Sequence, residues 1–264
     1  SDGNTITISG IDFGIKNPVE PLRYVNFEEG VSGDPYIESE TSGGLHSTSG
    51  IIYSDTYSRG VQSLSARQSF EGSTYNQELG INNANTILTP TAFLHGYWRI
   101  DTNGAIPRNA KILNLAAAPF GSGDWASRVD FDNNPCNPIS SAQAILTMKE
   151  GCPAGVNEVE YSSPSTIIGA DNSWHRIDSW IDLTTAYRWV NVDNSLWEQA
   201  TNPEGTMIDG CTGTDTTIGY VYFGHYWDDN SCTPADVYRY WDEIYIDTTQ
   251  ARIEICDSSI WQDR

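Results

Sequence analysis

The chain has 264 residues, with 35 Asp and Glu against 14 Lys and Arg, so its formal net charge at pH 7 is −21. A negative field of this size repels nucleic acid and anionic membranes. It also disfavours a highly anionic polysaccharide, unless basic residues gather locally. No run of about eighteen apolar residues occurs, so the sequence predicts no membrane-spanning helix.

Composition and cysteine count indicate an extracellular or cell-surface protein. Asn, Thr, Ser, Gly, Tyr and Trp are abundant and Lys is scarce, which is typical of secreted β proteins. Five cysteines fit an oxidising compartment. Two local disulfides are predicted, Cys136 with Cys152 and Cys211 with Cys232. Cys256 remains, either as a buried thiol or as a link between chains.

Alternating apolar and polar residues predict many short strands and no long helix. We expect strands within 4–13, 22–27, 59–70, 93–101, 111–115, 126–131, 172–183, 218–226 and 240–247, and a short edge strand within 32–50. Residues 143–149 fit a strand or one short helix, and their length favours a strand. Residues 187–197 form a predicted hairpin that turns at 193–195, where Asp and Asn suit turn geometry. Such spacing predicts one all-β domain, a sandwich or barrel, over 19–264, preceded by a strand extension over 1–18.

The stretch from 217 to 256 organises the prediction of faces, because strand side chains alternate between the two sides of a sheet. Within 240–247, Asp242 is expected on the face of Ile244 and Ile246, with Trp241 opposite. The predicted core residues of all strands are Trp98, Ile177, Ile181, Val190, Val221, Phe223, Ile244 and Ile246.

Polar and aromatic residues occupy the alternate positions of the same strands. Aromatic rings stack on sugar rings, while Arg and Tyr donate hydrogen bonds to hydroxyl groups. The predicted glycan-binding surface lies on one concave sheet and comprises His95, Tyr97, Arg99, Arg176, Trp180, Tyr222 and Tyr226. The alternative is that these side chains only cover a sheet.

Four segments, 24–30, 174–180, 190–196 and 241–247, occur in the order found in a known fold type. Together they resemble the concanavalin A-like β-jelly roll of legume-type lectins, laminin G-like modules, family-16-type glucanases and several polysaccharide lyases. The resemblance covers most of residues 20–255 and implies an all-β, antiparallel two-sheet jelly-roll sandwich. The whole chain most resembles secreted bacterial proteins of this type.

An enzymatic role is the first alternative to binding. The paired-carboxylate strand of the glucanases is absent. In alginate-lyase-type jelly rolls, a strand similar to Y-F-K-A-G-x-Y carries a tyrosine that acts as base and acid. Residues 220–226 resemble this strand and put Tyr226 at the catalytic position, but Tyr222 stands where the family has Lys. β-Elimination also needs a cation beside the uronate carboxylate, for which Arg176 is expected and Arg99 and Arg239 are further candidates.

The resemblance also implies a calcium ion between the first and the last strand, on the convex side. The carboxylates at the matching places are Glu28 and Asp242, and backbone carbonyls and water would complete the shell. A cation would relieve repulsion in a chain of this charge. Acidic residues at strand ends are as commonly just solvated, so both alternatives stay open.

Three functions remain. The first is a non-catalytic carbohydrate-binding protein that uses the aromatic concave sheet. The second is a structural subunit of an extracellular filament or surface layer, assembled through the N-terminal strand or Cys256 as a homo-oligomer. The third is a polysaccharide lyase that uses Tyr226 and Arg176.

Overall fold

The computed structural model describes residues 22–38, 44–47, 50–59, 63–69, 79–81, 89–101, 110–118, 125–131, 145–150, 159–167, 172–182, 187–193, 195–201, 217–224 and 238–249. Within these ranges the chain forms fifteen β-strands and no helix. No described segment is therefore a helix able to cross a bilayer. The predicted strand 4–13, the extension 1–18, all five cysteines and Tyr226 lie outside the described residues.

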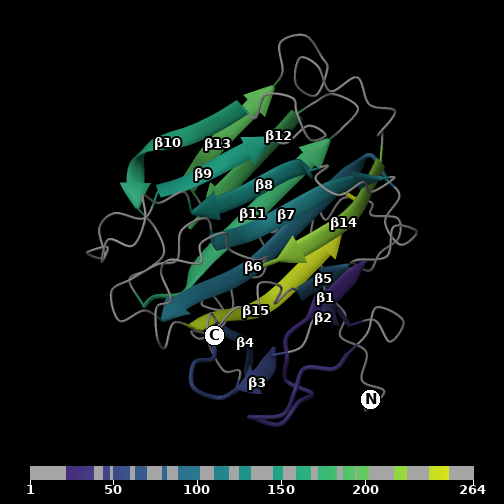
Figure 1. Cartoon of the computed structure of the whole chain (residues 1–264), viewed down its shortest axis with the longest axis vertical. Coiled ribbons are helices and arrows are strands. Elements are labelled where there is room, and N and C mark those ends of the chain that lie inside the picture. The colour runs from purple at the N-terminus through teal and green to yellow at the C-terminus, as the bar shows by residue number, and fades with distance from the viewer. Residues whose placement is uncertain are drawn as a thin grey trace, which may run out of the picture.

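Two antiparallel sheets contain all of these strands. Sheet A runs in the order β13 (Ser195–Thr201), β12 (Tyr187–Val192), β11 (His175–Asp182), β6 (Thr91–Asp101), β15 (Tyr238–Asp247), β4 (Ser65–Ser69), β3 (Ile52–Ser54), and β1 (Arg23–Val25) also pairs with β15. Sheet B runs in the order β10 (Val159–Ile167), β9 (Ile145–Glu150), β8 (Trp125–Phe131), β7 (Ala110–Ala118), β14 (Thr217–Phe223), β5 (Leu79–Ile81), β2 (His46–Ser47). Figure 1 labels the strands along the chain.

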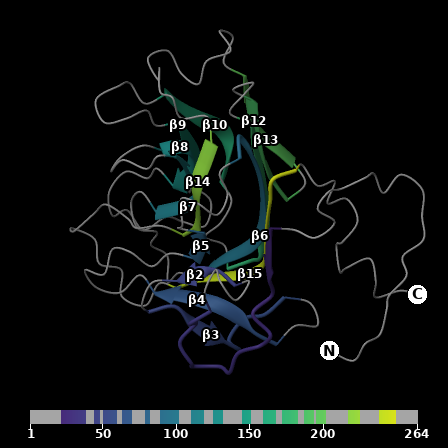
Figure 2. The same ribbon diagram turned by 90° about the vertical axis from the view of Figure 1, so that its right-hand side faces the viewer.

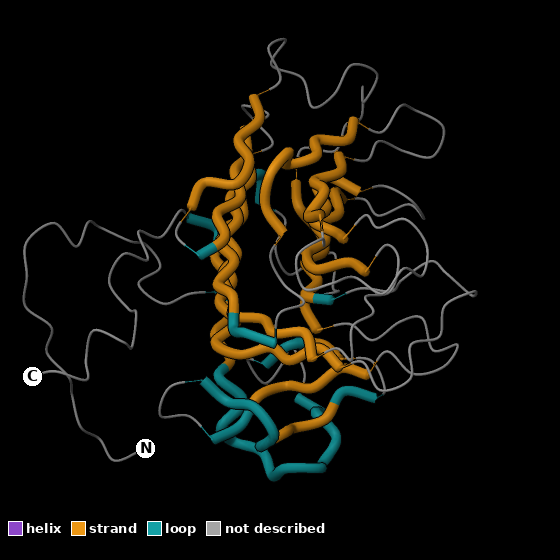
Figure 3. Tube along the Cα trace, turned by 90° about the vertical axis from the view of Figure 1, so that its left-hand side faces the viewer, coloured by secondary structure: helices purple, strands orange, loops and turns teal. Residues whose placement is uncertain are grey.

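The sheets pack face to face as a sandwich. Figure 2 shows them edge-on as two layers, with β7, β8, β9 and β14 in one layer and β6, β12, β13 and β15 in the other. Much of the described loop structure gathers at one end of the sandwich, around β3 (Figure 3). The predicted all-β, antiparallel two-sheet architecture is confirmed.

Alternation correctly predicted the side chains between the sheets. All eight predicted core residues are buried, each with at most 4% of its surface exposed. Phe223 of β14 packs edge-on against Trp241 of β15, with 5.4 Å between ring centroids. This contact joins the two sheets, because β14 belongs to sheet B and β15 to sheet A.

The face predicted for Asp242 is wrong, and a β-bulge explains why. The register of β15 against β6 shifts between Asp242 and Tyr245, where Glu243 has a positive φ of 48°. A bulge inserts one residue and changes the alternation on its strand. Trp241 therefore faces the core together with Ile244, while Asp242 pairs with Tyr97 on the outer face of sheet A.

A buried polar group also lies between the sheets. Arg239 donates from Nε to Oε1 of Gln68 at 2.7 Å, and the indole N–H of Trp241 donates to the same oxygen at 2.7 Å. The Gln68 amide donates to the carbonyl of Phe223 at 3.3 Å. Burial lowers the pKa of Arg239 to about 9. These bonds connect β4 and β15 of sheet A to the end of β14.

Candidate functional site

Five of the seven predicted ligand-binding residues lie together on the outer face of sheet A. Tyr97 of β6 pairs with Arg176 of β11, and His95 and Arg99 lie two residues away from Tyr97 on the same face. Trp180 lies on the same face of β11, opposite Phe93. The concentration of polar and aromatic residues predicted from alternation is thus present on this sheet.

This outer face is a packed polar layer. His95 is 7% and Tyr97 is 6% exposed, and their rings meet edge-on at 5.1 Å. Arg99 lies over the Tyr57 ring, with its guanidinium carbon 3.7 Å from the centroid. The most central side chains of this layer contact one another, whereas Trp180 is only partly buried.

Asp178 is the centre of this layer. His95 Nδ1 lies 2.6 Å from one carboxylate oxygen, and Arg176 contacts the other through Nε at 2.8 Å and Nη2 at 2.6 Å. Burial alone would raise the pKa of the Asp178 carboxyl, but the bonds from His95 and Arg176 hold this pKa below its usual value. Arg176 is therefore committed to a carboxylate of its own chain.

Asp242 lies across β6 from Asp178, and none of the hydrogen bonds that it makes within the described residues comes from a cationic side chain. Its carboxylate accepts the backbone N–H of Glu243 at 2.8 Å and that of Arg59 at 3.2 Å. The Arg59 guanidinium contacts Glu243 instead and stacks over the Tyr97 ring, 3.3 Å from the centroid. Burial raises the pKa of Asp242 to about 8, and the charges of Glu243 and Glu28 add to the rise.

The predicted calcium ligands are electrostatic neighbours, because the charge of Glu28 contributes to the raised pKa of Asp242. Glu28 also accepts the backbone N–H groups of Ser63 at 2.9 Å and Leu64 at 2.8 Å, and the Ser63 hydroxyl at 2.7 Å. A buried carboxyl with a raised pKa suits a cation. Among the described residues, however, no group of three or more His, Cys, Asp or Glu residues has metal-binding geometry. The calcium ion stays a prediction.

The expectation that all seven residues share one sheet is wrong for Tyr222. Its strand, β14, belongs to sheet B, so Tyr222 lies on the opposite side of the sandwich from the outer face of sheet A. Tyr222 is 7% exposed. The cations proposed to assist a tyrosine on this strand, Arg176, Arg99 and Arg239, all belong to sheet A. None of these three arginines lies beside Tyr222 in its sheet.

Sheet B instead aligns a row of polar residues with Tyr222. Tyr222 of β14 pairs with Asn114 of β7, Asn114 with Arg128 of β8, and Arg128 with Lys149 of β9. Paired residues of an antiparallel sheet lie about 5 Å apart and share a face. The inner face of β14 carries Val221 and Phe223, so this polar row occupies positions on the outer face.

Sequence reasoning missed Asn114, Arg128 and Lys149. Their strands were predicted, but alternation within one strand does not show which residues of different strands are paired. The signal that could have been used was weaker. Arg128 and Lys149 are two of only 14 basic residues, and they fall in consecutive predicted strands.

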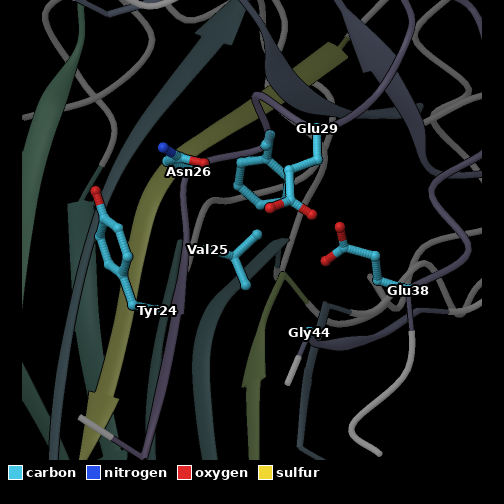
Figure 4. A pocket seen from close by; sticks show the side chains of 7 residues that line it. Tyr24, Val25, Asn26, Glu29, Glu38 and Gly44 are labelled. Carbon is cyan, nitrogen blue, oxygen red and sulfur yellow. The ribbon is translucent and has the colours of Figure 1, made fainter. Parts of the chain in front are cut away.

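A pocket of about 310 Å³ opens at the loop end of sheet A, beside β1. Figure 4 shows the carboxylates of Glu29 and Glu38 pointing toward one another across it. Its lining comprises Tyr24, Val25, Asn26, Phe27, Glu29, Glu38 and Gly44. No residue of this pocket was among the predicted site residues, because the pocket joins a strand end to a loop.

Comparison with known proteins shows the fold. No protein-family model matches the chain, and no curated protein matches it. Among solved structures, alginate lyase Aly36B superposes with a TM-score of 0.59 at 11% identity, over 87% of this chain and 98% of that chain. The marine PL-14 alginate lyase from Aplysia kurodai gives 0.58 at 11% identity, over 88% and 100%. The endo-β-1,4-glucuronan lyase from the fungus Trichoderma reesei gives 0.56 at 17% identity, over 87% and 96%.

These superpositions span nearly the whole of each solved chain, and the two antiparallel sheets account for all described strands. The chain is therefore a concanavalin A-like β-jelly roll.

Proposed function

We propose that this chain is an extracellular protein that binds an acidic polysaccharide along the outer face of sheet B. The observation that carries the proposal is the polar row Tyr222–Asn114–Arg128–Lys149, which pairs two basic residues on adjacent strands. In a chain of net charge −21, a uronate polymer is repelled everywhere except where basic residues gather. The row places two cations side by side, and it keeps a net positive charge although Glu160 of β10 pairs with Lys149 on its other side.

The chemistry of the row suits a uronate unit. Arg binds a carboxylate through two parallel N–H donors, and Lys adds a compact positive charge. The amide of Asn114 both donates and accepts hydrogen bonds, as sugar hydroxyls require. Three jelly rolls of similar structure are named as lyases of alginate or glucuronan, which supports a carbohydrate ligand.

The row also favours β-elimination as a second candidate function. In this reaction a base removes the proton next to the uronate carboxylate, the bond to the leaving sugar oxygen breaks, and an unsaturated uronate forms. A cation must neutralise the carboxylate, and Arg128 lies in the same row as Tyr222, two strands away across β7, whereas Arg176 lies in the other sheet. One solved variant of the similar alginate lyase, with one lysine and one tyrosine replaced by alanine, is bound to an alginate tetrasaccharide. Lys149 and Tyr222 supply the same two residue types here.

Binding tests the first function. Alginate and polyglucuronate should bind to the wild-type chain, and neutral β-glucans should not. Arg128→Gln and Lys149→Gln should each weaken binding about tenfold, because each removes one charge-assisted contact. Arg67→Gln is the matched control, since Arg67 lies on sheet A over the Tyr238 ring. Equal binding by all three variants would show that the polar row does not bind the polysaccharide.

The alternatives separate in the same experiments. If Trp180→Ala abolishes glycan binding while Arg128→Gln does not, the ligand surface is the predicted aromatic face of sheet A. Release of unsaturated uronate, followed by its absorbance, identifies a lyase, and its loss in Tyr222→Phe or Tyr226→Phe assigns the base. Size analysis that finds only large assemblies and no glycan binding would favour the filament subunit.

A further inference from the structure

The pocket beside β1 is chemically unlike the polar row of sheet B. The described residues that line it supply two carboxylates, one amide and apolar or aromatic side chains, and none of them is basic. Of the described residues, none hydrogen bonds or pairs with the Glu29 carboxylate. This pocket therefore presents net negative charge together with an aromatic wall.

The walls of the pocket are held in place. Glu38 accepts hydrogen bonds from the hydroxyls of Tyr36 at 3.0 Å and Tyr53 at 3.4 Å, so its carboxylate is oriented before any ligand arrives. Burial raises the pKa of Tyr53 to about 12, and the charges of both Glu38 and Glu29 contribute. The two carboxylates thus act on one small region. Gly44 approaches Glu38 so closely that an added Cβ would lie 2.6 Å from its Oε2.

Two exposed hydrophobic side chains, Tyr24 and Ile37, lie in or next to the lining of the pocket. The exposed large hydrophobic residues among the described residues are Tyr24 at 50%, Val31 at 65% and Ile37 at 82%. Tyr24 lines the pocket, and Ile37 directly precedes Glu38 in the chain. Exposed apolar side chains around a polar recess are characteristic of protein–protein contact sites.

We propose that this pocket receives a lysine or arginine side chain of a partner protein, with Tyr24 and Ile37 covering the flanking residues of the partner. Glu29 and Glu38 would pair with the cationic head. The Tyr24 ring, which lies beyond Val25 from the two carboxylates in Figure 4, would pack against the partner's flanking residues. The net charge of the chain steers a basic segment toward it. This interaction is separate from polysaccharide binding and uses the other sheet.

The test uses a peptide of alternating lysine and leucine and the same peptide with every lysine acetylated. The unmodified peptide should bind and shift the backbone amide resonances of Asn26 and Gly44, and acetylation should weaken binding about tenfold because it removes the charge. Glu29→Gln should weaken binding about tenfold as well. Gly44→Ala should also weaken it, since the added methyl group displaces Glu38.

Asp34→Asn is the matched control. Asp34 is exposed in the same loop but does not line the pocket. The substitution removes the same charge as Glu29→Gln, so it should change peptide affinity by no more than about twofold. Arg128→Gln should leave peptide affinity unchanged, which separates this proposal from the polysaccharide one. Equal weakening by Glu29→Gln and Asp34→Asn would overturn it. So would equal binding of the acetylated peptide, or calcium alone shifting Asn26 and Gly44 while the peptide shifts neither.

Discussion

Two carboxylates on the outer face of sheet A lie on opposite sides of β6, and their pKa values are shifted in opposite directions. Asp178 pairs with His95 in the ladder to β11, and Asp242 pairs with Tyr97 in the ladder to β15. They are 2% and 0% exposed, so burial penalises both charges. The pKa of Asp178 is nevertheless lowered, whereas that of Asp242 is raised to about 8.

The difference lies in the partners of each carboxylate. Asp178 has an arginine and a histidine, while Asp242 has two backbone N–H groups and the nearby charges of Glu243 and Glu28. Backbone dipoles alone do not compensate a buried charge when further carboxylates stand beside it. The same sheet face therefore contains one carboxylate stable as an anion and one that favours a proton or a cation.

The largest expected effect comes from removing the carboxylate of Asp178, whose charge is compensated by Arg176 and His95. Asp178→Ala leaves Arg176 and His95 without their carboxylate, so the free energy of unfolding should fall by about 3–5 kcal/mol. Denaturant unfolding measures this change. Asp182→Ala on the same strand is the control, because Asp182 is only partly buried and should cost about 1 kcal/mol or less. Equal costs would show that the partners of Asp178 contribute nothing.

Calcium binding tests the side of β6 on which Asp242 lies. If the ion binds the folded chain at Glu28 and Asp242, calcium at about 100 times its dissociation constant should stabilise the fold by about 2.7 kcal/mol. Thermal unfolding of metal-free protein with and without calcium gives this value. The increase should vanish in Asp242→Asn and in Glu28→Gln. A melting temperature that chelator leaves unchanged would refute the site.

The pH dependence of stability should also distinguish the two carboxylates. Asp242 has a folded pKa of about 8 against an ordinary value of 3.8, so between these values the folded state holds the extra proton. Stability should therefore fall as pH rises through this window, by up to about 1.4 kcal/mol for each pH unit. Asp242→Asn should remove this slope.

The pH dependence of stability that Asp178 contributes has the opposite sign. Its pKa is lowered on folding, so its contribution is present above its ordinary value and is lost only as the pH falls below it. Asp242→Asn should leave this acid limb unchanged. A slope near neutral pH that survives the substitution would belong to another group.

The smallest effect concerns the neighbour of Asp242. Glu243→Gln removes the ion pair with Arg59, at a cost of about 1 kcal/mol, and removes one of the charges that raise the pKa of Asp242. The midpoint of the neutral-pH stability profile should move to lower pH. Glu29→Gln, whose charge is not among the causes of the Asp242 shift, should leave the midpoint in place.

Alternation along single strands predicted much of the fold. On β6, Trp98 and Ile100 face the core while His95 and Tyr97 face outward, because a regular strand has a side-chain period of two. The same period failed after Asp242, since the inserted residue of a bulge has no signature in the apolar pattern. Local pattern therefore suffices until the backbone departs from regular geometry.

The candidate sites were harder to predict, because they depend on which strands are neighbours. Strand 217–223, which contains Tyr222, and strand 175–182, which contains Arg176, both alternate apolar with polar or aromatic residues, but they belong to different sheets. The pairing of Arg128 with Lys149 depends on register, and the facing of Glu29 and Glu38 depends on a loop that returns to β1. The order of residues along the chain does not by itself show which strands are neighbours, in which register they pair or where a loop returns.

The bulge on β15 also divides one edge of that strand between two partners. Before it, Tyr238–Trp241 pair with β4, and after it, Ile244–Ile246 pair with the three residues of β1. Because the ladder is interrupted there, β1 can separate from β15 without breaking the pairing of β4. We therefore expect amide exchange in the three residues of β1 to be faster than in β4. A partner that binds this pocket would add its binding energy to the short pairing of β1 with β15.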